Sequence, residues 1–261
     1  MSVILHFDAW KLGLLFFVLM LGSGWLGAMS RPSAGDAAKG ENTRIPDASI
    51  ALFALLLAFT FSGASDRYEN RKGFLLDEAI AIGDFATTAS MLESPEREQI
   101  RHELIDYVKE RLAFGRVHID SPEMEDVASR SREIQSNIQS ILREVITAKK
   151  STTIHTPLLN GFNGITMTHD KAFYGSRNQV SDTIILLLVT FGLISAFMTG
   201  RFGVSRDRSS RLLPSMTWIV VYTVLVTAVF TVIMDLEQPH RGVMKNSKVP
   251  LTDLLTALQQ P

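Results

Sequence analysis

The chain has 261 residues, of which 46% are hydrophobic, and its formal net charge is −1. It contains no cysteine, which excludes disulfide bonds, thiol catalysis and cysteine-ligated metal sites. The charges are balanced and no basic face stands out, so the sequence gives no indication of a nucleic-acid partner.

Four apolar stretches dominate the chain, two near its start and two towards its end. They cover residues 12–29, 48–64, 183–199 and 212–234. Each is close to the roughly 20 residues that a helix needs to cross a bilayer core, and none carries a charged side chain. Their residues are apolar on all sides, which is typical of membrane-spanning helices. The sequence therefore predicts an all-α integral membrane protein with four transmembrane helices in two pairs.

The first apolar stretch has an alternative interpretation as a cleaved signal peptide. The residues before it lack the basic start of such peptides, and Trp10 with Lys11 is typical of an interfacial anchor. This pattern favours a retained membrane helix over a signal peptide.

A long charged segment separates the two pairs, and its patterns predict further helices. Residues 66–92 keep the apolar spacing of a helix that continues the second membrane helix. The motifs SPERE at 94–98 and SPEME at 121–125 each predict a helix start, with serine as N-cap and proline at the first position. These helices are expected to reach Phe114 and Lys149, and another is expected over 158–173. No strand-like alternation is present in the sequence.

These patterns predict four parts along the chain. Residues 1–64 hold transmembrane helices one and two, residues 65–180 form an extramembrane helical domain, residues 181–236 hold transmembrane helices three and four, and residues 237–261 form a C-terminal turn and short helix. The basic residues in the short linkers after the first and third helices would alone place the middle domain outside the cytoplasm.

The fourth apolar stretch carries a possible polar stripe. Thr223, Thr227 and Thr231 follow one another at four-residue spacing, and Asp235 continues the same helix face. Such a stripe either packs against a partner helix or lines a wet path. Because threonine can bond its own backbone carbonyl four residues back, the pattern favours packing and leaves the wet path open.

No catalytic or metal-binding constellation stands out. The six histidines show no metal-ligand spacing on one helix face, and there is no phosphate-binding glycine loop. Acidic pairs such as Asp77 with Glu78 are expected to be solvated helix faces, and a membrane enzyme using Glu78 or Asp235 is the least favoured alternative. We therefore predict no enzyme, no cofactor and no metal site.

The end of the second apolar stretch reads LAFTFSGASDRYENRK from Leu57 to Lys72. This resembles bestrophins, whose second membrane helix ends in a leucine-small-phenylalanine step followed by Asp-Arg-aromatic. The segments DLEQPHRG from Asp235 and VPLTDL from Val249 resemble the bestrophin acidic turn and the helix start that follows it. The run DEAIAIG from Asp77 is more similar to the bestrophin-like family of mostly bacterial membrane proteins. The turn holds few acids here, and calcium needs six or more oxygen ligands, so no calcium site is expected.

Bestrophins are pentameric ion channels, and the resemblance implies a pore lined by the second membrane helix of a homo-oligomer. An apolar ring in such a pore gates by dewetting. The implied pore constriction is formed by Ala51, Leu55 and Phe59. The implied pore mouth and its structural ion pairs involve Asp66, Arg67, Arg71, Asp235 and Glu237.

The resemblance also implies the partners and the location of the protein. The implied partners are membrane lipid, further copies of the chain in a homo-oligomer that the family makes pentameric, and small inorganic ions. The implied location is the inner (plasma) membrane, with both termini and the middle domain in the cytoplasm. The rival hypothesis is a non-conducting membrane scaffold or sensor whose helical domain, residues 66–180, binds a protein partner.

Overall fold

The computed structural model describes residues 7–30, 44–114, 122–148, 152–202, 213–238 and 247–260. These residues form helices and no strands, which confirms the predicted all-α class. The helices are α1 (Ala9–Met29), α2 (Arg44–Ala89), α3 (Glu96–Phe114), α4 (Pro122–Thr147), the 3-10 turn η2 (Thr152–Ile154), α5 (His155–Arg177), α6 (Asp182–Phe202), α7 (Leu213–Leu236) and α8 (Val249–Gln259).

Four segments of the described chain are long and apolar enough to cross a membrane. They lie in α1, in α2, in the range Thr152–Phe202 that contains α6, and in α7. This arrangement confirms the predicted membrane protein with two pairs of spanning helices. The predicted continuation of the second membrane helix is also present, since α2 runs without a break to Ala89.

The chain folds into two compact units. The membrane unit comprises residues 1–66 and 179–244, and the helical unit comprises residues 67–178 and 245–261. Helix α2 contributes its first part to the membrane unit and its second part to the helical unit. The helix α8 near the C-terminal end belongs to the helical unit.

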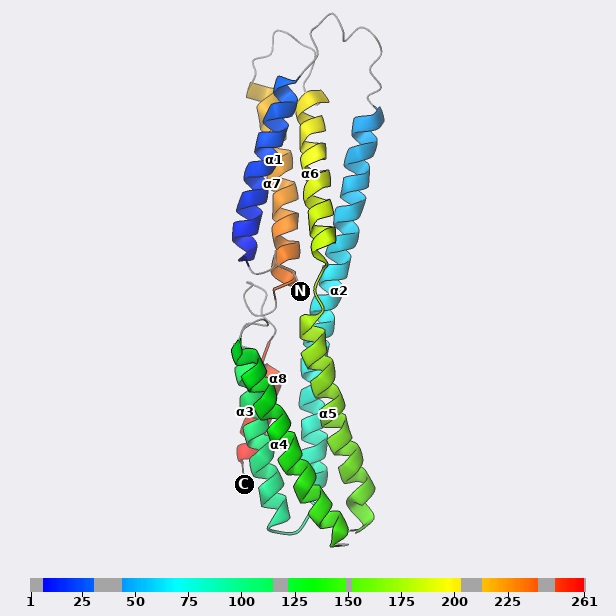
Figure 1. The fold of residues 1–261 in the computed structure, drawn as a ribbon, viewed down its shortest axis with the longest axis vertical. Coiled ribbons are helices and arrows are strands. Elements are labelled where there is room, and N and C mark those ends of the chain that lie inside the picture. The colour runs from blue at the N-terminus through cyan, green and yellow to red at the C-terminus, as the bar shows by residue number, and fades with distance from the viewer. Residues whose placement is uncertain are drawn as a thin grey trace, which may run out of the picture. The chain divides into compact units, whose positions relative to one another are not determined.

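In the membrane unit, α1 packs against α6 and α7 through small residues (Figure 1). Gly192, Ala196 and Gly200 recur every four residues on the buried face of α6. A Cβ atom added at Gly27 of α1 would overlap the backbone carbonyl of Phe197. Small residues at such spacing let helix backbones approach closely in a membrane, where no hydrophobic effect drives helices together.

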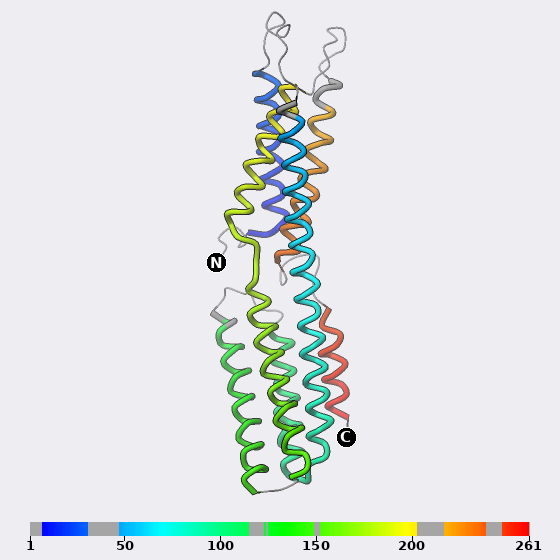
Figure 2. Tube along the Cα trace, turned by 90° about the vertical axis from the view of Figure 1, so that its right-hand side faces the viewer, coloured from blue at the N-terminus to red at the C-terminus, as the bar shows by residue number. Residues whose placement is uncertain are grey.

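In the helical unit, α2, α3, α4, α5 and α8 surround a large apolar core. Its fully buried members include Ile82, Phe85, Ile100, Leu104, Ile138, Leu142, Leu158 and Ile165. Figures 1 and 2 show α5 running alongside the second part of α2, and the side chains agree, since a Cβ atom added at Gly161 would lie 3.1 Å from the Phe85 ring.

The helix boundaries in this unit largely follow the sequence signals. Helix α4 begins at Pro122, as the SPEME motif predicts. Helix α3 begins at Glu96, one residue later than expected, and the peptide bond between Ser94 and Pro95 is cis. Helix α5 is longer at both ends than the predicted residues 158–173.

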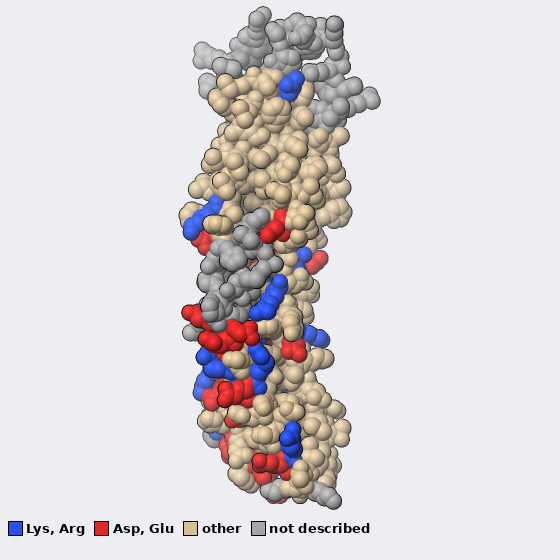
Figure 3. Space-filling model, in the orientation of Figure 1, with Lys and Arg blue, Asp and Glu red and all other residues tan. Residues whose placement is uncertain are grey.

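Charged side chains are distributed unevenly over the surface. On the face shown in Figure 3, Lys, Arg, Asp and Glu gather on the helical unit, while the helices of the membrane unit are almost free of them. This division is expected for a membrane protein, because placing a charge in a bilayer core costs free energy whereas placing it in water does not.

Candidate pore-lining face and buried ionic cluster

Helix α2 has two different faces within the membrane unit. Phe53, Thr60 and Ala64 are 2%, 7% and 0% exposed and lie on the side that packs within the unit. The other side is open, with Leu55 and Phe59 53% and 69% exposed. Only 17% of the most apolar window of α2 is buried, against 28%, 33% and 39% for the other three spans. A single chain therefore leaves one side of this membrane helix largely exposed.

The three residues predicted to form the constriction share this open face. Ala51, Leu55 and Phe59 are all exposed and follow one another at four-residue spacing. Asp66 is also exposed, and its position seven residues after Phe59 returns it to the same side of the helix. The open face is thus apolar over three turns and becomes acidic at its end.

The other residues predicted for the pore mouth differ in their surroundings. Arg67 is half-buried, whereas Arg71 is buried and its Nη1 donates to the Asn178 carbonyl at 3.5 Å. Asp235 is half-buried, and Glu237 is 0% exposed. Glu237 Oε2 accepts a hydrogen bond from the backbone N–H of Val180 at 3.0 Å.

Gln238 is a structural residue that the sequence did not single out. Its Oε1 accepts the backbone N–H of Ala9 at 3.2 Å, and its Nε2 donates to the Phe7 carbonyl at 2.7 Å. Together with Glu237, it ties the end of α7 to the backbone at the starts of α1 and α6. A lone glutamine gives no sequence signal for such a role, because its partner lies 229 residues away.

The predicted polar stripe of α7 faces the inside of the membrane unit. Thr223 is 0% exposed, and Thr231 Oγ1 donates to the Thr227 carbonyl at 2.8 Å. A Cβ atom added at Gly13 would overlap the Thr231 hydroxyl, so this threonine packs directly on α1. These contacts favour helix packing over a wet path for Thr231.

The expectation that Asp77 and Glu78 form a solvated face is wrong for Glu78. Asp77 is exposed, but Glu78 is 0% exposed and lies in the middle of the helical unit. Arg111, itself 2% exposed, binds its carboxylate in a bidentate manner, with Nε to Oε1 at 2.7 Å and Nη2 to Oε2 at 2.9 Å. A buried carboxylate needs a partner of this kind, because an unpaired buried charge is very costly.

Three further side chains complete what we call the ionic cluster, which consists of Glu78, Tyr107, Arg111, Gln135 and His169. The Tyr107 hydroxyl donates to Glu78 Oε1 at 2.9 Å and lies 2.9 Å from His169 Nδ1. Gln135 Nε2 donates to the Tyr107 oxygen at 3.4 Å. The five residues come from α2, α3, α4 and α5, so the cluster joins four helices of the unit.

The electrostatics of the cluster keep Glu78 ionised and Tyr107 protonated. Burial alone would raise the pKa of Glu78, but the Arg111 charge, the nearby His169 ring and the hydrogen bonds from Arg111 lower this pKa from 4.5 to about 2. Burial and the neighbouring Glu78 carboxylate raise the pKa of Tyr107 well above its ordinary value. The phenol therefore retains the proton that it donates to Glu78.

We expect the helical unit to lose stability in acid because of Glu78. Its pKa is lower in the folded chain than in the unfolded chain, so its contribution is fully present above about pH 4.5 and is lost as the pH falls towards 2. Thermal unfolding of the detergent-solubilised protein, followed by circular dichroism across this range, measures the loss. An Asp77→Asn control is expected to keep the same acid dependence.

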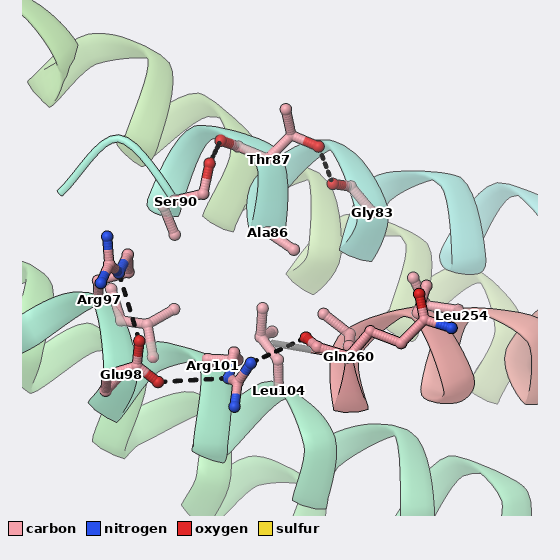
Figure 4. Close-up of a pocket in the computed structure, with 14 residues that line it drawn as sticks. Gly83, Ala86, Thr87, Ser90, Arg97, Glu98, Arg101, Leu104, Leu254 and Gln260 are labelled. Carbon is pink, nitrogen blue, oxygen red and sulfur yellow. Dashed lines mark hydrogen bonds and ion pairs between the residues drawn. The ribbon is translucent and has the colours of Figure 1, made fainter.

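A pocket of about 650 Å³ lies between α2, α3 and α8 of the helical unit (Figure 4). Its lining includes apolar side chains such as Leu104 and Leu258. The two arginines at its rim are already occupied: Arg97 and Arg101 each contact the Glu98 carboxylate at 3.3 Å, and Arg101 also donates to the Gln260 carbonyl at 3.0 Å. Both arginines therefore already have partners within the protein, and we assign no ligand to this pocket.

No group of three or more His, Cys, Asp or Glu side chains within the described ranges is arranged to hold a metal ion. The second half of the segment that resembles the bestrophin acidic turn, residues 239–242, lies outside those ranges.

The fold and the sites define a helical membrane protein. It has a membrane unit with four spanning segments and a separate helical unit with its own apolar core. A family model described as "Bestrophin-like domain" matches residues 45–251. The chain therefore belongs to the bestrophin-like family, as its motifs predict. No curated protein sequence matches it.

Solved structures share this fold. Two crystal structures of a bacterial bestrophin homologue from Klebsiella pneumoniae, each of a single-residue variant, superpose with TM-scores of 0.69 and 0.66 at 12% and 13% sequence identity. The first match covers 97% of this chain and 96% of that chain, and the second covers 94% and 95%. A crystal structure described as a membrane protein superposes with a TM-score of 0.64 at 11% identity, covering 94% of this chain and 95% of that chain. At these identities the likeness establishes the fold alone.

Proposed function

We propose that this protein is an oligomeric ion channel in which α2 helices from several copies line a pore for small inorganic ions. The observation that carries the proposal is the open face of α2, where the exposed Leu55 and Phe59 are followed on the same side by the exposed Asp66. Lipid would suit the apolar part of this face, but a carboxylate in line with it suits a water-filled path.

The remaining features of the channel follow the family. We propose a homo-pentamer in the inner membrane, with Ala51, Leu55 and Phe59 forming stacked apolar rings around its axis. Asp66, Arg67 and Arg71 would form the mouth, with Asp235 and Glu237 as their candidate partners. Both termini and the helical unit would lie in the cytoplasm.

Current across a planar bilayer that contains the purified protein, under a salt gradient, tests the proposal. Discrete steps are expected, and the sign of the reversal potential will tell whether cations or anions pass. Well-folded oligomers that give no current would contradict the channel and favour the scaffold, whose partner would bind the helical unit.

Replacing Phe59 by alanine is expected to increase the current through the open-face constriction. Loss of an apolar ring lowers the dewetting barrier, and each reduction of about 1.4 kcal/mol in a barrier raises a rate about tenfold. Single-channel recording measures the effect. Phe61→Ala is the matched control, because Phe61 is 41% exposed and lies on a different side of α2. Equal currents in the two variants would mean that Phe59 does not line the pore.

The proposed orientation predicts where an introduced cysteine reacts. The chain has no cysteine, and Ser136 of α4 is exposed, so Ser136→Cys gives a single reactive position on the helical unit. We expect this cysteine to resist an impermeant thiol reagent in intact cells and to react after lysis. Labelling in intact cells whose outer membrane, if present, has been made permeable would place the helical unit outside.

A further inference from the structure

We propose that His169 is a proton-binding site at the centre of the helical unit, and that its protonation loosens α5 from the helices around it. The site is the ionic cluster, in which His169 is 5% exposed and its Nδ1 lies 2.9 Å from the Tyr107 oxygen and 3.8 Å from Glu78 Oε1. The inference assigns a regulatory site to the proposed channel. Only the current measurement described below rests on the proposed function, because the proton site itself is tested without any current.

The hydrogen bonds determine which nitrogen of His169 carries the first proton. A tyrosine hydroxyl has one proton to donate, and Tyr107 donates it to Glu78. The contact between Tyr107 and His169 can then form only with the imidazole as donor, so the neutral ring is protonated at Nδ1. Its Nε2 is the position that takes up a second proton.

The charged and titratable groups that face His169 come from two of the neighbouring helices. Helix α2 contributes Glu78, and α3 contributes Tyr107 and Arg111, which holds the same carboxylate. In the described part of the chain, α4 contributes the neutral amide of Gln135 to the cluster. On α5 itself, the Phe173 ring stacks on the imidazole with 6.3 Å between centroids and 11° between planes.

A second proton on His169 changes the net charge of the ionic cluster. With a neutral imidazole the cluster has no net charge, because the Glu78 carboxylate is matched by the Arg111 guanidinium. With an imidazolium it has one uncompensated positive charge, on a side chain that is only 5% exposed. Such a charge is relieved when water reaches it, and this requires α5 to separate from α2 and α3.

The position of His169 in the chain connects the site to the membrane. His169 lies on α5, and residues 178–181 join α5 directly to α6. Glu78 lies on α2, the same continuous helix that carries Leu55 and Phe59. A change in how α5 packs against α2 therefore acts on α2 itself and, through the short connection, on α6, and both of these helices have residues in the membrane unit. Histidine is the side chain that most readily gains a proton on acidification, so a fall in pH is the expected stimulus.

Two measurements on the purified, detergent-solubilised full chain test the proton site without any current. Nuclear magnetic resonance of protein with labelled histidine rings is expected to show the His169 ring taking up a proton on acidification, with its signal identified by its loss in His169→Asn. Hydrogen exchange of α5 at about pH 5.5 is expected to be about tenfold faster in the wild type than in His169→Asn, and equal in the two at about pH 8.

The variants are chosen to separate the proton site from a general packing defect. Asparagine keeps an N–H donor for Tyr107 and cannot be protonated, and His169→Gln supplies a second neutral side chain. Comparing variants at the same pH cancels the intrinsic pH dependence of exchange. His102→Asn is the matched control, because the His102 side chain is 78% exposed on α3, and it is expected to behave as the wild type. A His169 ring that stays neutral down to about pH 5, or an α5 exchange ratio that does not change with pH, would overturn the proposal.

Recording currents at the same two pH values separates this proposal from the channel itself. If the protein conducts, the wild-type current is expected to change between them, and the His169→Asn current is expected to stay constant. A protein that shows the titration and the exchange difference without any current would leave the proton site standing and remove the channel. A conducting protein whose α5 exchange does not depend on pH would support the channel and contradict the proton site.

Discussion

Replacing Glu78 by glutamine is expected to reduce the free energy of unfolding of the helical unit by about 3–5 kcal/mol. Glutamine has nearly the same shape as glutamate, so the loss comes from charge and not from packing. Without the carboxylate, the guanidinium of Arg111 is left as an unpaired charge at a site where only 2% of the residue is exposed. Chemical denaturation of the solubilised protein, followed by far-ultraviolet circular dichroism, measures the change.

The neighbouring acid provides the control for this substitution. Asp77 precedes Glu78 on the same helix but is exposed, so Asp77→Asn is expected to change stability by less than about 0.5 kcal/mol. The double variant Glu78→Leu with Arg111→Met is expected to recover much of the loss, because it leaves no charge buried. Equal effects of Glu78→Gln and Asp77→Asn would mean that Glu78 and Arg111 are not paired in the folded protein.

Replacing Gly200 by alanine is expected to disrupt the packing of α1 against α6. A Cβ atom at Gly200 would overlap the backbone carbonyl of Gly24 and would lie 3.0 Å from the backbone nitrogen of Ala28. Both obstacles are main-chain atoms of a helix, so no side chain can rotate away and the two helices must separate. We expect a loss of about 3 kcal/mol, at the upper end of the usual cost of overpacking.

Gly22 is the matched control, since it lies on α1 and a Cβ atom there would meet nothing within 4 Å. Gly22→Ala is expected to be neutral or slightly stabilising, because alanine is the better helix former by about 1 kcal/mol. Thermal unfolding and size-exclusion chromatography in detergent compare the two variants. If both behave like the wild type, α1 and α6 do not approach as closely as described.

Much of the fold could be predicted because its signals are local. The length and apolarity of a membrane span are properties of about 20 consecutive residues, and a serine-proline-acid start such as the one before α4 lies within a single turn. The spacing that places Leu55 and Phe59 on one face is also local, because a helix repeats every 3.6 residues.

The surroundings of polar residues could not be predicted in the same way. Asp77 and Glu78 are adjacent acids in one helix, yet one is exposed and the other is completely buried. The difference depends on Arg111, which lies 33 residues later on another helix. Gln238 and the backbone of Ala9 are 229 residues apart. No pattern within a sequence window reports such partners.

The sequence by itself determined that this chain is an all-helical membrane protein, because bilayer thickness and helix geometry act on short segments, and the resemblance of its motifs indicated the bestrophin-like family. Only the tertiary structure decided that Glu78 belongs to a buried ionic cluster with His169, and that α2 leaves one face of the membrane unit open. Burial is a property of all the elements that pack around a residue, so it exists only once those elements have come together.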